Sequence, residues 1–166
     1  MNNIEVDARQ VTSMFADLTS RQQRQVYRNA LRKGAGILAT ETKRQLRQTL
    51  GREASSRNWW NGRTLVSGVK SNADRNGTEA KVHIMGDFRL KFFEMGTRVR
   101  RTTGNNSASV RGRNPIRRQR VAANRGNINA AHFFRTAKSH KEREIFNSMD
   151  NLISQSIQRI ANRNRR

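Results

Sequence analysis

Residues 20–50 read SRQQRQVYRNALRKGAGILATETKRQLRQTL and form the longest periodic stretch of the chain. Apolar or small residues recur there every three or four positions, which is the spacing of one face of an α-helix. We therefore predict one long helix with Ser20 as its N-cap and Gly51 as its stop signal. Its predicted inward face consists of Tyr27, Leu31, Gly34, Ala35, Leu38, Thr42, Leu46 and Leu50. Gly34 and Gly36 are interpreted as a packing notch, because inward-facing glycines let another segment approach closely.

The rest of the chain predicts a second long helix and a hairpin. Residues 129–166 contain a helical run whose inward face is Ile145, Met149, Leu152, Ile153, Ser156 and Ile160. Residues 64–71 and 78–85 contain Val66, Val69, Val82 and Ile84 as strand formers. Because Asn76 and Gly77 are typical of a tight turn, we expect these two runs to pair as an antiparallel hairpin.

The densest apolar cluster of the sequence lies between the hairpin and Gly96. It consists of Phe88, Leu90, Phe92, Phe93 and Met95, and we expect it to anchor the core. Glu94 lies inside this cluster, where a carboxylate is costly to bury unless it has a partner. We expect a salt bridge or a backbone cap that fixes the following turn, within the chain or across a subunit boundary; a general acid is the minor alternative.

Trp59 and Trp60 stand together in a polar stretch that reads as a loop. Two isolated aromatic side chains can stack on bases, but base-stacking sites usually interleave several aromatics with basic strands. We therefore favour burial of both tryptophans against a neighbouring subunit or against the long helix.

The charge of the chain is strongly one-sided. Thirty-four lysines and arginines face twelve acidic residues, which gives a formal net charge of +22. Such self-repulsion requires an anionic partner or an acidic neighbour, and the excess of arginine over lysine favours phosphate. We expect no membrane partner, because the sequence has neither a long apolar span nor a basic helix with a strongly apolar face.

Residues 98–127, the arginine arm, concentrate this charge. The segment has no acidic residue, includes the only proline, Pro115, and reads as a loop within a single domain spanning residues 1–166. Two interpretations remain open: contact with duplex phosphates, or contact with an adjacent acidic subunit. The residues expected to make these contacts are Arg98, Arg100, Arg101, Arg111, Arg113, Arg117, Arg118, Arg120 and Arg125.

Enzymatic signatures are not found in the sequence. His83, His132 and His140 share no metal-ligand spacing, and there is no cysteine to act as a nucleophile or zinc ligand. No nucleophile elbow, phosphate-binding glycine loop or pair of catalytic carboxylates is present. We expect a non-enzymatic protein without catalytic residues, metal or cofactor, made in the cytoplasm because the start lacks a secretory signal.

Four short motifs, in order, resemble the tail-component family of tailed bacteriophages, which includes minor tail, tail-completion and head-to-tail joining proteins. The first, residues 30–35 with 41–44, looks like the first helix of that family. The second, residues 61–69, is similar to its entry into the sheet. The third, Phe92-Phe93-Glu94-Met95-Gly96-Thr97, looks like its aromatic-Glu-aromatic-Gly-Thr signature, with Met95 in the usual aromatic place. The fourth, His132-Phe133-Phe134-Arg135-Thr136-Ala137, resembles a Pro-Phe-Leu-Arg-Pro-Ala box whose two prolines this chain lacks.

This resemblance implies an α+β fold with a small antiparallel sheet packed against two long helices. It also implies a homo-oligomeric ring, with a hexamer favoured over a dodecamer, located in the neck or tail of the virion beside connector and tail-tube proteins and close to packaged DNA. Subunit-interface or structural roles are expected for Trp59, Trp60, Phe92, Phe93, Glu94, Gly96, Thr97, Phe133 and Phe134. The chief alternative is a basic nucleic-acid-binding protein of the ribosomal or nucleoid type, and a nuclease or processing enzyme is a weaker one.

Overall fold

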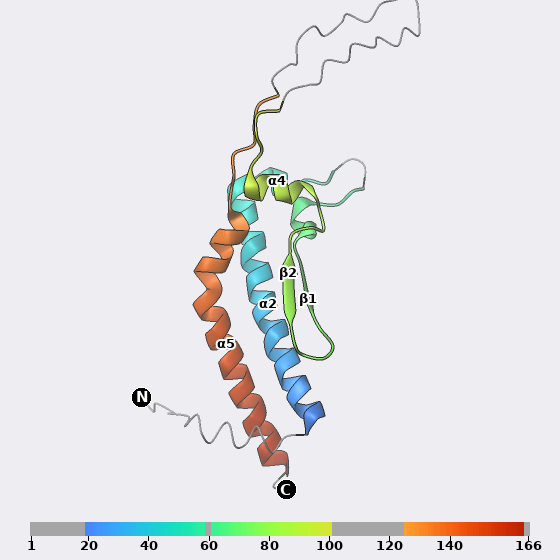
Figure 1. The fold of residues 1–166 in the computed structure, drawn as a ribbon, viewed down its shortest axis with the longest axis vertical. Helices are drawn as coiled ribbons and strands as arrows, with labels where there is room; N and C mark the ends of the chain where they lie inside the picture. The colour runs from blue at the N-terminus through green and yellow to red at the C-terminus, as the bar shows by residue number, and fades with distance from the viewer. Residues whose placement is uncertain (1–18, 59–60, 101–124, 165–166) are drawn as a thin grey trace, which may run out of the picture.

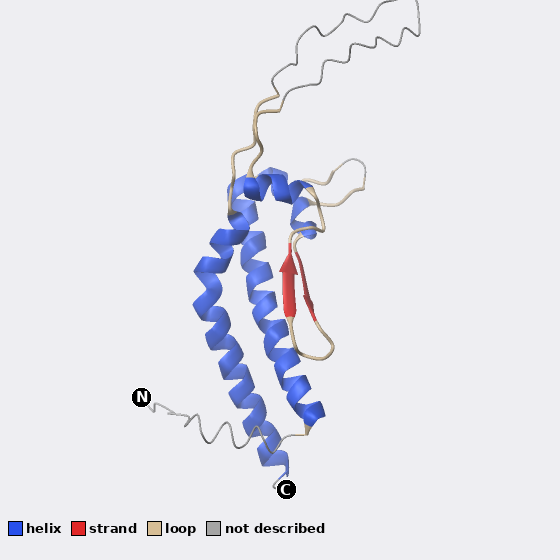
Figure 2. Cartoon of the chain, in the orientation of Figure 1, coloured by secondary structure: helices blue, strands red, loops and turns tan. Residues whose placement is uncertain are grey.

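The computed structural model describes residues 19–58, 61–100 and 125–164. It is an α+β fold, as expected, in which two long helices lie side by side and a two-stranded sheet packs along one of them (Figures 1 and 2). The elements in chain order are α2 (Ser20–Leu50), α3 (Arg52–Ser55), the 3₁₀ helix η1 (Leu65–Gly68), β1 (Lys70–Ala73), β2 (Ala80–His83), α4 (Arg89–Met95) and α5 (Phe133–Asn164). The helix α2 lies between α5 and the hairpin, and the short helices gather near its C-terminal end.

Helix α2 has a well-formed cap at each end. The hydroxyl oxygen of Thr19 accepts a hydrogen bond from the Gln22 backbone at 3.4 Å, and the Gln22 side chain accepts one from the Thr19 backbone at 2.9 Å. This capping box satisfies two backbone donors that the first turn leaves unpaired, so the cap is Thr19 and not Ser20. The predicted stop is confirmed: Gly51 has φ 56°, and its N–H donates to the carbonyl of Arg47.

The buried surface of α2 is wider than the single stripe predicted from the periodicity. The periodicity places Tyr27 on the inward face, but its side chain is 43 % exposed. The buried surface of α2 is wide because α5 covers one side of the helix and the hairpin covers another. The buried residues of α2 are Val26, Ala30, Gly34, Ala39, Glu41, Thr42 and Leu46.

The packing notch is confirmed at Gly34 and wrong at Gly36. A Cβ atom at Gly34 would lie 2.7 Å from the sulfur of Met149 and 3.1 Å from a methyl of Ile145, both on α5. No atom lies within 4 Å of the corresponding position at Gly36. At Gly34, therefore, side chains of α5 fill the space that a side chain on α2 would occupy.

The hairpin is confirmed, but its strands are shorter than predicted. Strand β1 pairs antiparallel with β2 from Lys70 opposite His83 to Ala73 opposite Ala80. Val66 was predicted to lie in a strand, but it lies in η1, where the Thr64 hydroxyl accepts a hydrogen bond from the Ser67 backbone at 3.3 Å. This side-chain cap offers the backbone a local alternative to sheet pairing.

The core lies at the α4 end of the helix pair. The buried residues that pack together there are Ala39, Leu46, Ala54, Leu65, Val66, Val69, Leu90 and Phe133. The expectation that the apolar cluster of residues 88–95 anchors the core is confirmed for Leu90, which is fully buried, and for Phe93, which packs against the core. It is wrong for the other three large apolar side chains, which face outward. Phe88 is 60 % exposed, Phe92 43 % and Met95 67 %. A seven-residue helix lying on the surface can present only one side to the core.

Candidate functional site

The side chain of Glu94 caps the N-terminus of α5. One carboxylate oxygen accepts a hydrogen bond from the backbone N–H of Phe134 at 2.8 Å, and the other accepts one from the N–H of Arg135 at 3.1 Å. The first turn of a helix has unpaired N–H donors and the positive end of the helix dipole, so a carboxylate is well suited to this position. The predicted backbone cap is confirmed, but it fixes a helix forty residues away and not the turn that follows Glu94.

Backbone contacts extend this junction on both sides of Glu94. The carbonyl of Phe93 accepts a hydrogen bond from Ala131 at 2.8 Å, and that of Glu94 accepts one from His132 at 3.3 Å. His132, directly before α5, has a positive φ of 47°. A side chain is rarely found in that conformation, so the surrounding hydrogen bonds hold His132 in place.

Gly96 and Thr97 complete the contact between the two segments. The N–H of Thr97 donates to the carbonyl of Ile128 at 2.9 Å, and the hydroxyl of Thr97 accepts from the N–H of Ile128 at 3.0 Å. Gly96 has φ 73°, and a Cβ atom there would lie 2.9 Å from both the Ala130 nitrogen and the Ile128 oxygen. Only glycine fits this conformation at this distance. We call the junction of residues 93–97 with residues 128–135 the Glu94 clasp.

The ends of the arginine arm run next to each other beyond the clasp. The N–H of Arg100 donates to the carbonyl of Gly126 at 2.9 Å, and the N–H of Arg125 donates to the carbonyl of Arg100 at 2.8 Å. Figures 1 and 2 show these two segments extending together from the α4 end of the molecule, away from the helix pair. The two ends of the arm therefore lie next to each other, directly beyond the Glu94 clasp.

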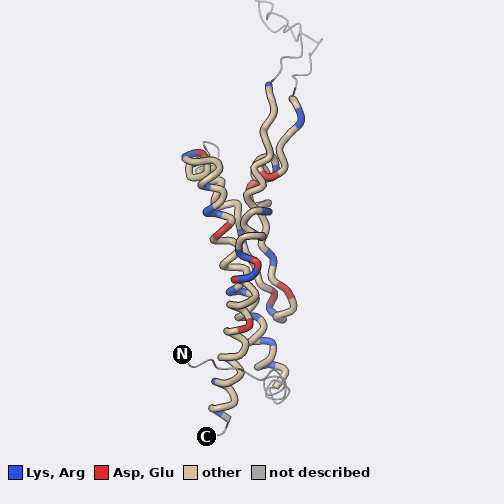
Figure 3. The backbone as a smooth tube through the Cα atoms, turned by 90° about the vertical axis from the view of Figure 1, so that its left-hand side faces the viewer, with Lys and Arg blue, Asp and Glu red and all other residues tan. Residues whose placement is uncertain are grey.

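The structure places three of the nine predicted contact arginines. Arg98, Arg100 and Arg125 are exposed at the base of the arm. Figure 3 shows lysine and arginine along the whole described length, with fewer acidic positions between them. The other six arginines, together with Trp59 and Trp60, lie outside the described residues; those six are Arg101, Arg111, Arg113, Arg117, Arg118 and Arg120.

The aromatic residues of the two motifs divide between core and surface. Phe133 is 1 % exposed within the core of its own chain, and Phe134 and Phe93 pack partly buried against that core. These three residues therefore have a structural role within the chain. Phe92 is exposed and makes an edge-to-face contact with Phe88, with ring centroids 6.1 Å apart.

Sequence reasoning missed the extent of exposed apolar surface beside the clasp. Besides Phe92, four large apolar side chains of residues 85–99 are more than half exposed: Met85, Phe88, Met95 and Val99. We call these five side chains the 85–99 apolar surface. The signal was visible in the sequence as a dense apolar run, but its periodicity did not show which members face outward.

A salt bridge orients the start of α4. The guanidinium of Arg89 donates to both carboxylate oxygens of Asp87, at 2.9 and 2.6 Å, and the Arg89 backbone N–H donates to the same carboxylate at 3.0 Å. The hydrogen bond from the Arg89 side chain lowers the pKa of Asp87 against the opposing effect of burial. The carboxylate thus stays ionised, and its hydrogen bonds to Arg89 stabilise the first turn of α4.

The described residues around the Glu94 clasp bring together backbone donors, a carboxylate acceptor and exposed apolar side chains. Among all the described residues, no three His, Asp or Glu side chains lie close enough to hold a metal ion. None of the helices in residues 19–58, 61–100 and 125–164 has the length and apolar character that a bilayer span requires. Comparisons of the chain with protein-family models, with curated proteins and with solved structures gave no significant match.

Proposed function

We propose that this chain is a structural component of a tailed-phage virion, a ring-forming neck or tail-completion protein that lies close to the DNA channel. The observation that carries the proposal is the 85–99 apolar surface, whose segment runs along the chain into the base of the arginine arm. Several large apolar side chains exposed in one short segment are typical of a protein–protein contact. A basic arm leaving from the same end is typical of a subunit that reaches beyond its own fold.

The geometry of the clasp supports the resemblance on which the proposal depends. Two of the four motifs, residues 92–97 and 132–137, are far apart in the chain but contact each other through Glu94, Phe134 and Arg135. The matched positions therefore have physical roles, since the Glu94 carboxylate caps α5 and Gly96 allows close approach. Motifs that cooperate in one junction support common ancestry more strongly than motifs matched separately.

The proposed contact between copies is apolar, because the net charge of the chain opposes association of identical copies through charge. Copies that each carry a net charge of +22 repel one another, so an identical neighbour does not supply a net negative charge to the arm. The 85–99 apolar surface supplies the attraction between copies. The arginine arm then binds phosphate or an acidic neck or tail protein.

The test measures the mass and shape of the purified full chain. Native mass measurement and negative-stain imaging should show a closed ring, with a hexamer favoured. The double substitution Phe88→Ser with Phe92→Ser should shift the population to monomers that keep the helical circular-dichroism spectrum, because neither side chain belongs to the buried core. Phe146→Ser is the matched control, since Phe146 is 58 % exposed on α5, away from this surface. A monomer at every concentration that also fails to join virions would overturn the proposal.

The alternative function is a nucleic-acid-binding protein of the ribosomal or nucleoid type, which the net charge of +22 favours. Such a protein would bind nucleic acid as a monomer, with affinity that falls steeply with salt. A ring subunit would instead assemble with itself and with neck or tail proteins. Measuring mass and salt dependence on the same preparation separates the two.

A further inference from the structure

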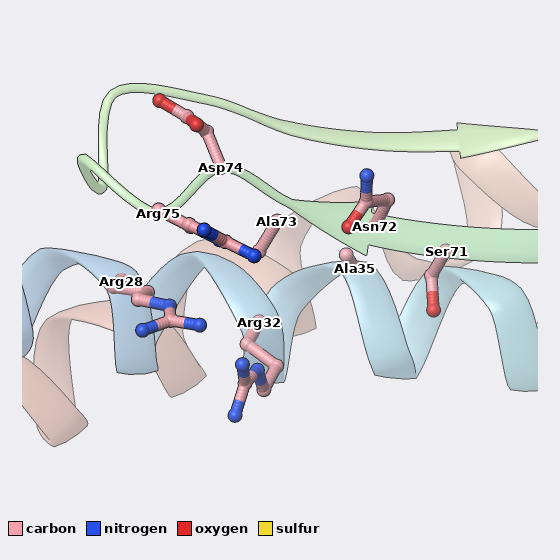
Figure 4. A pocket seen from close by; sticks show the side chains of 8 residues that line it. All are labelled: Arg28, Arg32, Ala35, Ser71, Asn72, Ala73, Asp74 and Arg75. Carbon is pink, nitrogen blue, oxygen red and sulfur yellow. The ribbon is translucent and has the colours of Figure 1, made fainter.

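A hollow lined by arginine lies between α2 and the turn that joins β1 to β2. Its volume is ≈ 690 Å³, and its basic lining residues are Arg28 and Arg32 from α2 and Arg75 from the turn. Figure 4 shows Arg28 and Arg32 projecting from neighbouring turns of α2, with Arg75 alongside. A second hollow of ≈ 380 Å³ shares these three arginines and adds Arg21 and Arg24. We call the two hollows together the α2–turn groove.

A glycine holds the turn against the helix and so fixes the groove. Gly77 has φ 71°, and a Cβ atom there would lie 2.7 Å from the Arg24 carbonyl oxygen and 3.0 Å from the Arg28 nitrogen. This close approach of two backbones brings Arg75 next to Arg28 and Arg32. The backbone contact between the turn and α2 therefore sets the positions from which Arg28, Arg32 and Arg75 extend.

The groove has little counter-charge of its own. Asp74 is the acidic residue of its lining, and its carboxylate accepts a hydrogen bond from the Thr78 hydroxyl at 3.0 Å. That hydrogen bond and the nearby charge of Arg28 lower the pKa of Asp74, so it is ionised, but in the described structure it forms no salt bridge with any of the five arginines. The Nε atom of Arg28 is buried and has no hydrogen-bond partner within the described residues.

We propose that the α2–turn groove binds the phosphodiester backbone of a nucleic acid, without sequence preference. Arg21, Arg24, Arg28 and Arg32 recur at helical spacing along one side of α2 over about 16 Å, from eleven steps of roughly 1.5 Å each. This row of arginines is longer than a single phosphate group, so it can contact several successive phosphates of a polyanion. Guanidinium groups form forked hydrogen bonds to phosphate oxygens, and phosphate contacts position a nucleic acid without reading its bases.

The lining favours nucleic acid over an acidic protein. Among the described residues that line the groove, the apolar ones are Ala35 and Ala73, and no larger apolar side chain takes part. Protein interfaces usually bury apolar or aromatic anchors at their centre, and this groove has none to offer. The turn that joins β1 to β2 lies at the opposite end of the hairpin from α4 (Figure 1), and neither Phe88 nor Phe92 lines the groove.

The test compares two triple variants of the full chain that carry the same net charge. The groove variant is Arg28→Gln, Arg32→Gln, Arg75→Gln, and the control is Arg47→Gln, Arg52→Gln, Arg159→Gln, three exposed positions outside the groove. Binding to short DNA and RNA duplexes is measured by fluorescence anisotropy between about 50 and 200 mM salt. Losing three phosphate contacts should lower the slope of log affinity against log salt by about 2.7 relative to the unsubstituted chain.

The control variant should lower that slope by less than about one. Measuring DNA and RNA duplexes separately identifies which of the two binds through the groove. Arg32→Gln alone, at an exposed position, should lower the slope by about 0.9 and is the reserve if the triple variant fails to fold; its control, Arg47→Gln alone, should lower the slope by less than about 0.3. Equal slopes for groove and control variants would overturn the proposal, and so would a groove-dependent preference for a polyglutamate peptide over both duplexes. Because the ring test uses substitutions at Phe88 and Phe92, failure of either proposal leaves the other measurable.

Discussion

The carboxylate of Glu94 lies 2.8 Å from the backbone nitrogen of Phe134, forty residues later in the chain, and caps the N-terminus of α5. This single side chain joins the end of α4 to the start of α5. Because the arginine arm is inserted between these two points, the same hydrogen bond that stabilises the helix also closes the loop from which the arm extends.

Replacing Glu94 with alanine should destabilise the fold. The substitution leaves two N–H groups of α5 without their acceptor, and loss of a helix cap costs about 0.5–2 kcal/mol; we expect the upper part of that range because the acceptor is charged. Urea unfolding followed by circular dichroism measures the change. Glu142→Ala is the control, since Glu142 is exposed on the same helix and should cost less than about 0.5 kcal/mol. Equal unfolding midpoints for the two variants would show that the cap does not contribute.

A second prediction separates backbone strain from steric contact at the base of the arm. Gly96 and Gly126 both have positive φ, 73° and 70°, but only at Gly96 would an added Cβ atom have backbone atoms within 4 Å. Alanine should cost about 1–2 kcal/mol at Gly126 from conformation alone. At Gly96 it should cost roughly 3 kcal/mol or more, because the Ile128 segment must also shift. Amide hydrogen exchange at Thr97 and Ile128 should accelerate in Gly96→Ala and not in Gly126→Ala; similar exchange in both would contradict the close approach.

A third prediction compares two glycines of the same helix. Alanine at either Gly34 or Gly36 gains helix propensity, worth up to about 1 kcal/mol in a helix interior. At Gly34 the added methyl meets Met149 and Ile145 of α5, so overpacking offsets this gain, whereas Gly36 has open space. We expect Gly36→Ala to be more stable than Gly34→Ala by about 1–2 kcal/mol. Thermal unfolding of the two variants measures the difference, and a more stable Gly34→Ala would contradict the notch.

The features that could be predicted from the sequence are those set by local chemistry. The length of α2 follows from its periodicity and from the stop at Gly51, and the hairpin follows from the turn residues Asn76 and Gly77. Each depends on residues within a few positions of one another. The requirement that Glu94 have a partner was also predictable, because burial of a lone carboxylate is costly wherever it occurs.

The features that could not be predicted depend on contacts between distant segments. The sequence from Phe88 to Met95 does not indicate that Leu90 is buried and Phe92 exposed, because the position of α4 on the helix pair decides which side chains are buried. The α2–turn groove could not be predicted because it forms where Gly77 packs on α2, a contact that brings Arg75 beside Arg28. Sequence periodicity places residues on a face of one element but does not give the register between elements.

The final prediction concerns Glu41, a buried carboxylate in α2 that is 4 % exposed. It accepts hydrogen bonds from the Arg44 guanidinium at 2.8 Å and from the Gln45 amide at 2.8 Å. The hydrogen bond from Arg44 is the largest cause that lowers the pKa of Glu41 from 4.5 to about 2, against the opposing effect of burial. Because the folded pKa lies below the unfolded one, this interaction stabilises the fold above about pH 5 and is lost as the pH falls towards about 2.

Glu41→Gln should therefore lower the free energy of unfolding near neutral pH by about 2 kcal/mol, less than the full pKa shift implies because Arg44 is half exposed to solvent. It should also flatten the dependence of stability on pH between about 5 and 2. Urea unfolding at a series of pH values measures both effects. Glu79→Gln is the matched control, since Glu79 forms an exposed salt bridge with Lys81 and its loss should cost less than about 1 kcal/mol. An acid transition in Glu41→Gln as steep as that of the unsubstituted chain would assign the pH dependence to other carboxylates, because the glutamine side chain cannot take up the proton that drives the loss of stability.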